Sequence, residues 1–172
     1  VYKNTLFIFT SDNGGLSPDP AAKKLGHDSS HGFNGFKGNI LEGGHRVPFF
    51  ASWPGVITPG SQSDEPISAL DVVATIAAVT GQKISREQVM DSLNLLPLLT
   101  QTPDAEGHKV LMHYASKGKA ALRQGDWKLH LFGKKLKNLK PTHLFNLKTN
   151  PTEDNKQDYL SDPAQQERVQ QM

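Results

Sequence analysis

The sequence predicts an α/β fold followed by a small antiparallel sheet, from three features. Residues 4–10 (NTLFIFT) form an apolar, β-branched and aromatic run, typical of a strand covered on both faces in a parallel sheet. Residues 68–81 have apolar residues at helical spacing. Residues 109–147 contain four short strand-like segments separated by turn residues, which favours antiparallel pairing.

The first part of the chain alternates strands, a long loop and helices. Residues 14–46 lack periodicity and predict a loop of unusual length, which is typical of a functional loop. Residues 47–55 (VPFFASWPG) predict a second strand that ends at the Pro-Gly turn. The predicted helix at 68–81 ends at Gly81, and Ser85 is expected to cap a second short helix over 85–93. The expected inner face of the first helix consists of Leu70, Val73, Ile76, Ala77 and Thr80.

The second part is expected to be a small α+β unit. Its predicted strands are KVLMHYAS, KAALRQG, DWKLHLF and THLFNL, and Asp162 with Pro163 opens a terminal helix. We therefore expect two domains, over residues 1–105 and 106–172.

Composition excludes several classes of protein. The hydrophobic content of 36% and the net charge of +2 are typical of a globular protein, and no apolar run reaches the roughly 18 residues of a membrane helix. The chain has no cysteine, so it contains no disulfide, thiolate metal site or cysteine nucleophile.

Basic residues are concentrated in residues 108–150. This segment holds ten Lys or Arg and one acid, Asp126, for a net charge of +9, so the remainder carries −7. One interpretation is a solvated hairpin with a lysine-rich turn at 133–140. The other is a polyanion-binding module that combines these lysines with Trp127, His130 and Phe132.

Asp12 and Asn13 directly follow the first predicted strand. The Asn-Gly pair would suit a hairpin, but no partner strand follows, and Pro18 and Pro20 leave no clear helix for an N-cap. Ligands in open α/β sheets bind beyond the carboxyl ends of strands, where these residues lie. Their oxygens suit Ca²⁺ or Mg²⁺ rather than zinc.

Lys37 lies in a second polar segment, GFNGFKGNILEGGHRVPFF (32–50), with glycines on both sides. A compact ammonium there could meet an anionic oxygen. The segment is no Walker loop, because Gly38 follows the lysine. Glu42 and Arg46 have the spacing of a helical ion pair.

Five motifs together carry a family resemblance: FTSDNGG, FKGNILEGGHRVPFFASWPGVITPGS, SALDVVATIAAVTG, ALRQGDWKLHL and HLFNLKTNPTEDN. In this order and spacing, the chain resembles the C-terminal portion of an arylsulfatase-type sulfatase. The resemblance implies part of an alkaline-phosphatase-like α/β sandwich, followed by a small C-terminal antiparallel sheet with a terminal helix.

The resemblance also implies roles for individual residues. Asp12 and Asn13 match two ligands of an active-site cation, usually Ca²⁺, and Lys37 matches the lysine that contacts the sulfate. The EGG-x-R stretch at 42–46 is expected to support that loop. His31 could contact substrate or be a solvated loop histidine. The implied substrate is a sulfate ester, with a sulfated carbohydrate as one option, and the implied location is periplasmic or secreted.

The rest of the family's active site is absent from these residues. The formylglycine nucleophile arises in a C/S-x-P-x-R motif, which does not occur here, so we expect a sulfatase fragment that is inactive alone. The alternatives are a phosphodiester or phosphonate monoester hydrolase of the same superfamily, and the non-catalytic polyanion-binding module. We expect no nucleic-acid or membrane partner, and self-association through the exposed edge of the first strand.

Overall fold

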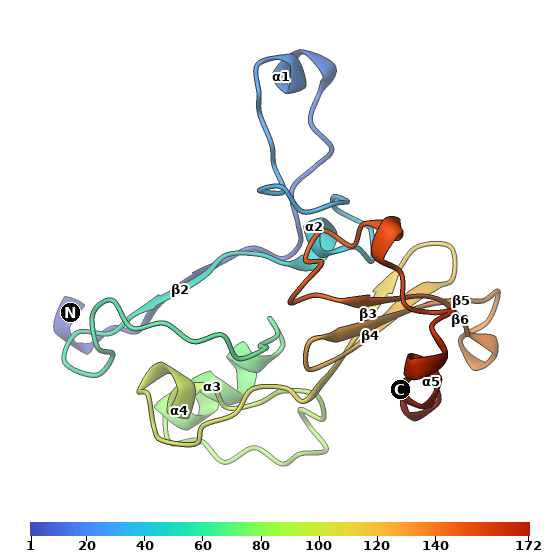
Figure 1. The fold of residues 1–172 in the computed structure, drawn as a ribbon. Coiled ribbons are helices and arrows are strands. Elements are labelled where there is room, and N and C mark those ends of the chain that lie inside the picture. The colour runs from blue at the N-terminus through green and yellow to red at the C-terminus, as the bar shows by residue number, and fades with distance from the viewer. The chain divides into compact units, whose positions relative to one another are not determined.

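The computed structural model describes residues 1–172, except for the side chain of Leu136, and it combines helices with antiparallel sheets in an α/β fold (Figure 1). The chain divides into two compact units: unit 1 comprises residues 1–10 and 48–109, and unit 2 comprises residues 11–47 and 110–172. These units reflect contacts rather than independent folding, so the domain boundary at residue 105 stays a prediction.

Unit 1 contains a two-stranded sheet. Strand β1 (Phe7–Thr10), preceded by the short helix η1 (Tyr2–Asn4), pairs antiparallel with β2 (Phe49–Ser52), so that Phe7 lies opposite Ser52. The expectation of a parallel-sheet strand buried on both faces was therefore wrong. Within the described residues β1 has one neighbouring strand, and its exposed and half-buried residues alternate.

Helices α3 (Asp71–Val79) and α4 (Leu96–Leu99) complete unit 1. The helix expected over 68–81 is confirmed, and Gly81, with a φ of 68°, follows its C-cap Thr80. Its predicted inner face was largely wrong. Asp71, Thr75 and Ala77 are buried, whereas Leu70, Val73 and Ile76 are 58%, 54% and 50% exposed.

Hydrogen bonds to a distant loop explain which face of α3 is buried. Asp71 Oδ1 accepts from Leu93 N at 2.8 Å, and Thr75 Oγ1 accepts from Leu95 N at 2.9 Å. The helix expected over 85–93 does not form. Gln88 N donates to Ser85 O and Gln88 Oε1 accepts from Ser85 N, which closes a turn instead.

Unit 2 contains the predicted four-stranded sheet. Strands β3 (Val110–Ala115), β4 (Lys119–Gln124), β5 (Trp127–Phe132) and β6 (Lys140–Asn146) pair antiparallel in sequence order, with a bulge at His130/Leu131. Buried Ala120, Leu129, Leu144 and Phe145 form its core. The prediction of this sheet is confirmed.

Short helices follow the sheet. Helix η2 (Leu136–Asn138) lies between β5 and β6, and η3 (Asn155–Gln157), η4 (Pro163–Gln165) and α5 (Gln166–Gln171) end the chain. Asp162 Oδ1 accepts from Ala164 N at 2.9 Å, so the predicted start of the terminal helix is confirmed. Arg168 of α5 stacks 4.5 Å from the ring centre of Trp127.

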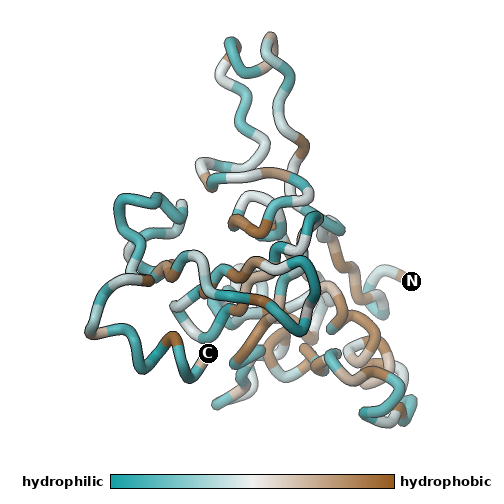
Figure 2. The backbone as a smooth tube through the Cα atoms, turned by 90° about the vertical axis from the view of Figure 1, so that its right-hand side faces the viewer, coloured by the Kyte–Doolittle hydropathy of each residue, from teal (hydrophilic) through white to brown (hydrophobic). Residues whose placement is uncertain are grey.

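Residues 14–46 are less irregular than expected. They form helix α1 (Pro20–Lys24), which Asp19 caps through Ala21 N and Ala22 N, and helix α2 (Glu42–His45). Figure 2 shows the segment around α1 as mainly hydrophilic. In the part of the chain that the structure describes, every helix is too short or too polar to cross a membrane.

Candidate functional site

The Asp12–Gly15 segment forms a compact turn directly after β1. Ser11 Oγ donates to Asn13 O at 2.9 Å, and Asn13 Nδ2 donates to Gly14 O at 3.0 Å. Because the amide nitrogen is engaged in this way, the amide oxygen of Asn13 is the group left to accept or to coordinate. The Asp12 side chain is exposed to solvent.

The backbone of Lys37 lies beside this turn. Lys37 N donates to Gly15 O at 2.8 Å. Gly35 and Gly38 flank the lysine with φ values of 87° and 86°, which glycine adopts without steric cost. The structure thus brings together the segments that carry Asp12, Asn13 and Lys37, while the chemical role of each stays a prediction.

Helix α2 joins the same segments through its glycines. Gly44 O accepts from Gly14 N at 2.9 Å, and Gly43 N donates to Asn34 O at 2.8 Å. A Cβ atom on Gly14 would lie 2.0 Å from Gly43 O, so the two backbones touch directly. A Cβ on Gly43 or Gly44 would lie 2.4 Å from Gly35 O or 2.3 Å from Asn39 O, so these glycines allow α2 to pack against the segment that carries Lys37.

His31 lies in a separate turn. Its φ is 53°, and Asp28 organises this turn by accepting from Ser30 N, Ser30 Oγ and Gly32 N. These hydrogen bonds, the one to Ser30 N foremost, lower the pKa of Asp28. His31 is exposed, and among the described residues no hydrogen bond joins it to Lys37 or to the Asp12–Gly15 turn.

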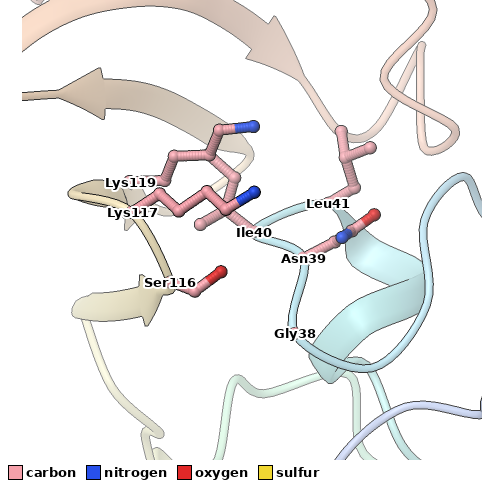
Figure 3. A pocket seen from close by; sticks show the side chains of 7 residues that line it. All are labelled: Gly38, Asn39, Ile40, Leu41, Ser116, Lys117 and Lys119. Atoms are coloured by element: carbon pink, nitrogen blue, oxygen red, sulfur yellow. The ribbon is translucent and has the colours of Figure 1, made fainter.

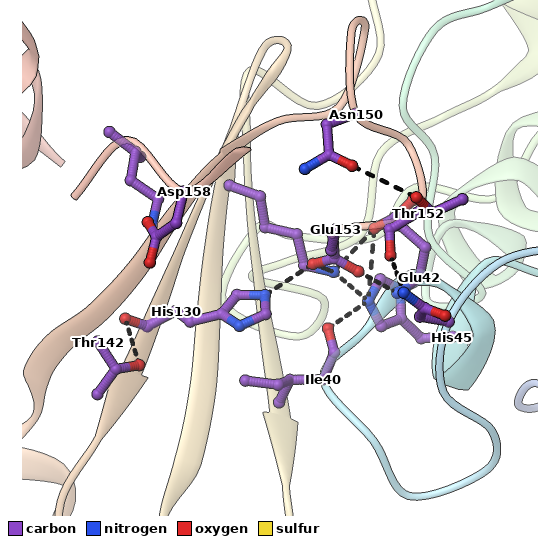
Figure 4. A network of polar contacts seen from close by, with 12 residues as sticks. Ile40, Glu42, His45, His130, Thr142, Asn150, Thr152, Glu153 and Asp158 are labelled. Carbon is purple, nitrogen blue, oxygen red and sulfur yellow. Dashed lines mark hydrogen bonds and ion pairs between the residues drawn. The ribbon is translucent and has the colours of Figure 1, made fainter. Parts of the chain in front are cut away.

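Lys128 on β5 is buried beneath α2. Its Nζ donates to Glu42 Oε1 at 2.8 Å, and it lies 2.9 Å from Glu153 Oε1 and 3.0 Å from His45 Nε2 (Figure 4). The ammonium thus lies within hydrogen-bond distance of two carboxylate oxygens and one ring nitrogen. The Lys128 side chain is 0% exposed, which requires such pairing, because an unpaired buried charge costs several kcal/mol.

Glu153 ties the same lysine to the start of α2. Its Oε2 accepts from Glu42 N at 2.6 Å, and its Oε1 lies 2.7 Å from His130 Nε2. Glu153 has a φ of 56°, a left-handed conformation that costs about 1–2 kcal/mol for a residue with a Cβ. We attribute the tolerance of this conformation to the charged contacts that it makes possible.

Burial and charge act in opposite directions on the two carboxyl groups. Burial raises the pKa of Glu42, but the Lys128 ammonium outweighs it and holds the pKa below its usual value. Burial likewise raises the pKa of Glu153, but the hydrogen bond from His130 and the Lys128 charge together outweigh it, so that this pKa also lies below its usual value. Both groups are therefore carboxylates at neutral pH.

Histidines near Lys128 stay neutral. Burial lowers the pKa of His45, His113 and His130, and the nearby Lys128 charge adds to this effect; the pKa of His113 falls to about 3. The rings of His45 and His113 stack with centres 3.9 Å apart. His45 Nε2 lies 3.0 Å from Lys128 Nζ and 3.1 Å from Ile40 O, so the tautomer of the ring decides which of the two it bonds.

The ion pair expected within α2 is present, because Arg46 Nη1 lies 3.4 Å from Glu42 Oε2. Lys128 and Glu153 were not predicted to contribute. One signal was available: Lys128 and His130 are two residues apart in a strand and share a face, so an otherwise apolar strand has two polar residues on one side. His130 and Lys128 are buried, so they are not available to stack on or pair with a polyanion.

The available ligands fit part of a hard-cation site. Asp12 and Asn13 offer a carboxylate and an amide oxygen, whereas Ca²⁺ takes six to eight oxygen ligands. No cluster of three or more His, Asp or Glu within the described residues is placed to hold a metal. Two side chains are too few, so further ligands would have to come from outside these residues.

Comparison with known proteins identifies the relatives of the chain. The sulfatase family model matches residues 1–82, which include Asp12, Asn13, Lys37 and α2. Rat steryl-sulfatase is 38% identical over 128 residues, which cover 74% of this chain and 22% of that protein. The chain is a partial sulfatase sequence. It spans about a fifth of the length of this relative.

Solved structures agree with this assignment. A Bacteroides thetaiotaomicron structure, described in connection with the metabolism of multiple glycosaminoglycans, superposes with a TM-score of 0.81 at 26% identity, covering 99% of this chain and 37% of that one. Ps i-CgsB in complex with k-i-k-neocarrahexaose is 33% identical with a TM-score of 0.67, covering 89% and 32%. The sulfatase chain therefore has the alkaline-phosphatase-like fold that the resemblance implied.

Proposed function

We propose that this chain is the C-terminal portion of a sulfatase that hydrolyses sulfate esters. The supporting observation is the hydrogen bond from Lys37 N to Gly15 O, which holds the lysine segment beside the Asp12–Asn13 turn. In this proposal, the Lys37 ammonium contacts a sulfate oxygen and stabilises the charge that shifts onto the oxygens during transfer.

Asp12 and Asn13 are proposed as two ligands of a Ca²⁺ ion. A bound divalent cation would polarise the sulfate oxygens. The resemblance places the nucleophile in a C/S-x-P-x-R motif, which these residues do not contain. We therefore propose that the 172 residues alone do not turn over sulfate esters.

Sulfated saccharides are the proposed substrates. Support comes from Ps i-CgsB, a relative at 33% identity that was solved with k-i-k-neocarrahexaose. The exposed lysines of the segment 108–150 would attract such an anion.

The test is an activity assay of the intact protein on an aryl sulfate and on the matching phosphate monoester and diester. We expect Lys37→Ala to lower kcat/KM for the sulfate by about 100-fold, because it removes one charge-stabilising donor. Lys24→Ala, an exposed lysine of α1, is the matched control and should leave the rate unchanged. Faster turnover of a phosphate ester, or full activity of Lys37→Ala, would overturn the proposal.

A further inference from the structure

A small cleft in unit 2 begins one residue after Lys37. It has a volume of about 220 Å³, and two segments line it: Gly38–Leu41, and the residues Ser116, Lys117 and Lys119 around the β3–β4 turn (Figure 3). Gly38 directly follows Lys37, so the cleft adjoins the segment that we propose binds sulfate.

The β3–β4 turn places a lysine where turn geometry does not favour one. Lys117 has a φ of 62°, a region that glycine and asparagine occupy most readily and that costs other residues about 1–2 kcal/mol. Strained residues of this kind concentrate at functional sites. Gly133 N donates to Gly118 O at 3.0 Å, so the turn is anchored to the chain after β5.

Charge in the cleft is one-sided. The lining residues include two lysines, the hydroxyl of Ser116 and the amide of Asn39, but no acid. Lys117 and Lys119 are exposed, and neither belongs to any of the ion pairs found among the described side chains. Two uncompensated ammonium groups beside hydroxyl and amide donors suit an anionic group.

The buried contacts of Lys128 hold both walls of the cleft in place. One wall, Gly38–Leu41, leads directly into α2, whose Glu42 is bound by Lys128 on β5. The other wall is the β3–β4 turn, and β4 pairs with β5 in the same sheet. A cleft fixed in this way loses little entropy when a ligand binds.

We propose that this cleft is a second anion site, which takes a second sulfate or a carboxylate of a polyanionic saccharide whose scissile sulfate ester contacts Lys37. The inference rests on the proposed function for the placement of the first sulfate. It assigns Lys117 and Lys119 a role in substrate selection rather than in catalysis.

Binding to the 172-residue chain tests the site without any turnover. Backbone amide NMR shifts would be followed during titration with glucosamine carrying one sulfate at O6, glucosamine carrying sulfates at N2 and O6, and the O6-sulfated glucosamine linked to glucuronic acid. We expect the second anionic group to tighten binding about tenfold, as for a charged hydrogen bond, with shifts at Asn39, Lys117 and Lys119. The disulfated sugar and the uronate compound distinguish sulfate from carboxylate as the second group.

Lys117→Asn with Lys119→Gln is the test variant, because asparagine tolerates the left-handed turn. It should bind all three compounds with similar affinity, so that the tenfold gain disappears. Lys134→Gln with Lys135→Gln removes the same charge from exposed positions outside the cleft and should keep the gain.

Two results would overturn the inference: an unchanged gain in the test variant, or loss of the gain in both double variants, which would indicate general electrostatic attraction. Failure of the intact protein to hydrolyse sulfate esters would refute the proposed function without changing these affinity ratios. The two proposals can therefore fail separately.

Discussion

The two units of this sulfatase chain differ in the charged groups that they bury. Unit 1 leaves large apolar side chains open to solvent, with Phe7, Phe9 and Phe50 between 54% and 64% exposed and the Val73 and Ile76 side of α3 at least half exposed. Unit 2 also exposes apolar side chains, among them Tyr114 at 63%, but it buries a lysine together with two carboxylates. Unit 2 thus contains a buried lysine network, and the exposed apolar faces of unit 1 are available for contact with another surface.

The largest expected effect is the loss of the buried charge in unit 2. Lys128→Met would leave Glu42 and Glu153 buried without their cation, and we expect the free energy of unfolding to fall by about 3–5 kcal/mol. Urea unfolding followed by circular dichroism measures this change. Lys134→Met, at an exposed position, should stay within about 0.5 kcal/mol of the parent chain. An equal urea midpoint for both variants would contradict the assignment of Lys128 as the central charge of unit 2.

Acid should lower the free energy of unfolding of unit 2 through the titratable groups around Lys128. His113, whose pKa is about 3 in the fold, stays neutral there while the unfolded chain takes up a proton below about pH 6.5. Stability is therefore present above that pH and declines as pH falls, by at most about 1.4 kcal/mol per pH unit for this group. The lowered pKa values of Glu42 and Glu153 add a second loss below about pH 4.5.

Denaturant unfolding at pH 7, 6, 5 and 4 measures the decline. His113→Gln keeps a neutral polar side chain that does not titrate, so the slope between pH 6.5 and 5 should become shallower in this variant. A steeper slope in His113→Gln, or maximal stability of the parent chain near pH 4, would contradict the prediction that protonation at low pH destabilises the fold.

The smallest expected effect on stability lies in unit 1. Phe50→Ser removes an exposed side chain, so the free energy of unfolding should change by no more than about 0.5 kcal/mol. We expect the variant to self-associate less at equal concentration, because exposed apolar patches promote association. Analytical ultracentrifugation would detect the difference, with the exposed Gln62→Ser as control. Identical sedimentation of Phe50→Ser and the parent would show that this face is not where copies meet.

Local sequence patterns predicted the elements whose partners are close in sequence. The strands of unit 2 follow one another with short turns, so alternation and turn residues sufficed. The inner face of α3 could not be predicted in this way. Thr75 lies on the buried face because its Oγ1 accepts a hydrogen bond from Leu95 N, 20 residues away. The segment 85–93 forms successive turns instead of the expected helix, and Ser92 Oγ at its end donates to Leu70 O, 22 residues away.

In the candidate site too, contacts between residues far apart in the sequence could not be predicted. Family resemblance pointed to Asp12, Asn13 and Lys37, and the backbone bond between Lys37 and Gly15 agrees with their proximity. Lys128 and Glu153 escaped prediction because their contacts with Glu42 span 86 and 111 residues. Pairing over such separations leaves no periodic trace in the sequence.

The split course of unit 2 affects how the protein is made. Its first segment ends at residue 47, and the strands that complete it begin at residue 110. At translation rates of roughly 5–20 residues per second, the Lys37 segment waits several seconds on the ribosome before β3–β6 emerge. During that interval Glu42 has no Lys128 to pair with, so chaperones and proteases meet the chain before its site is assembled.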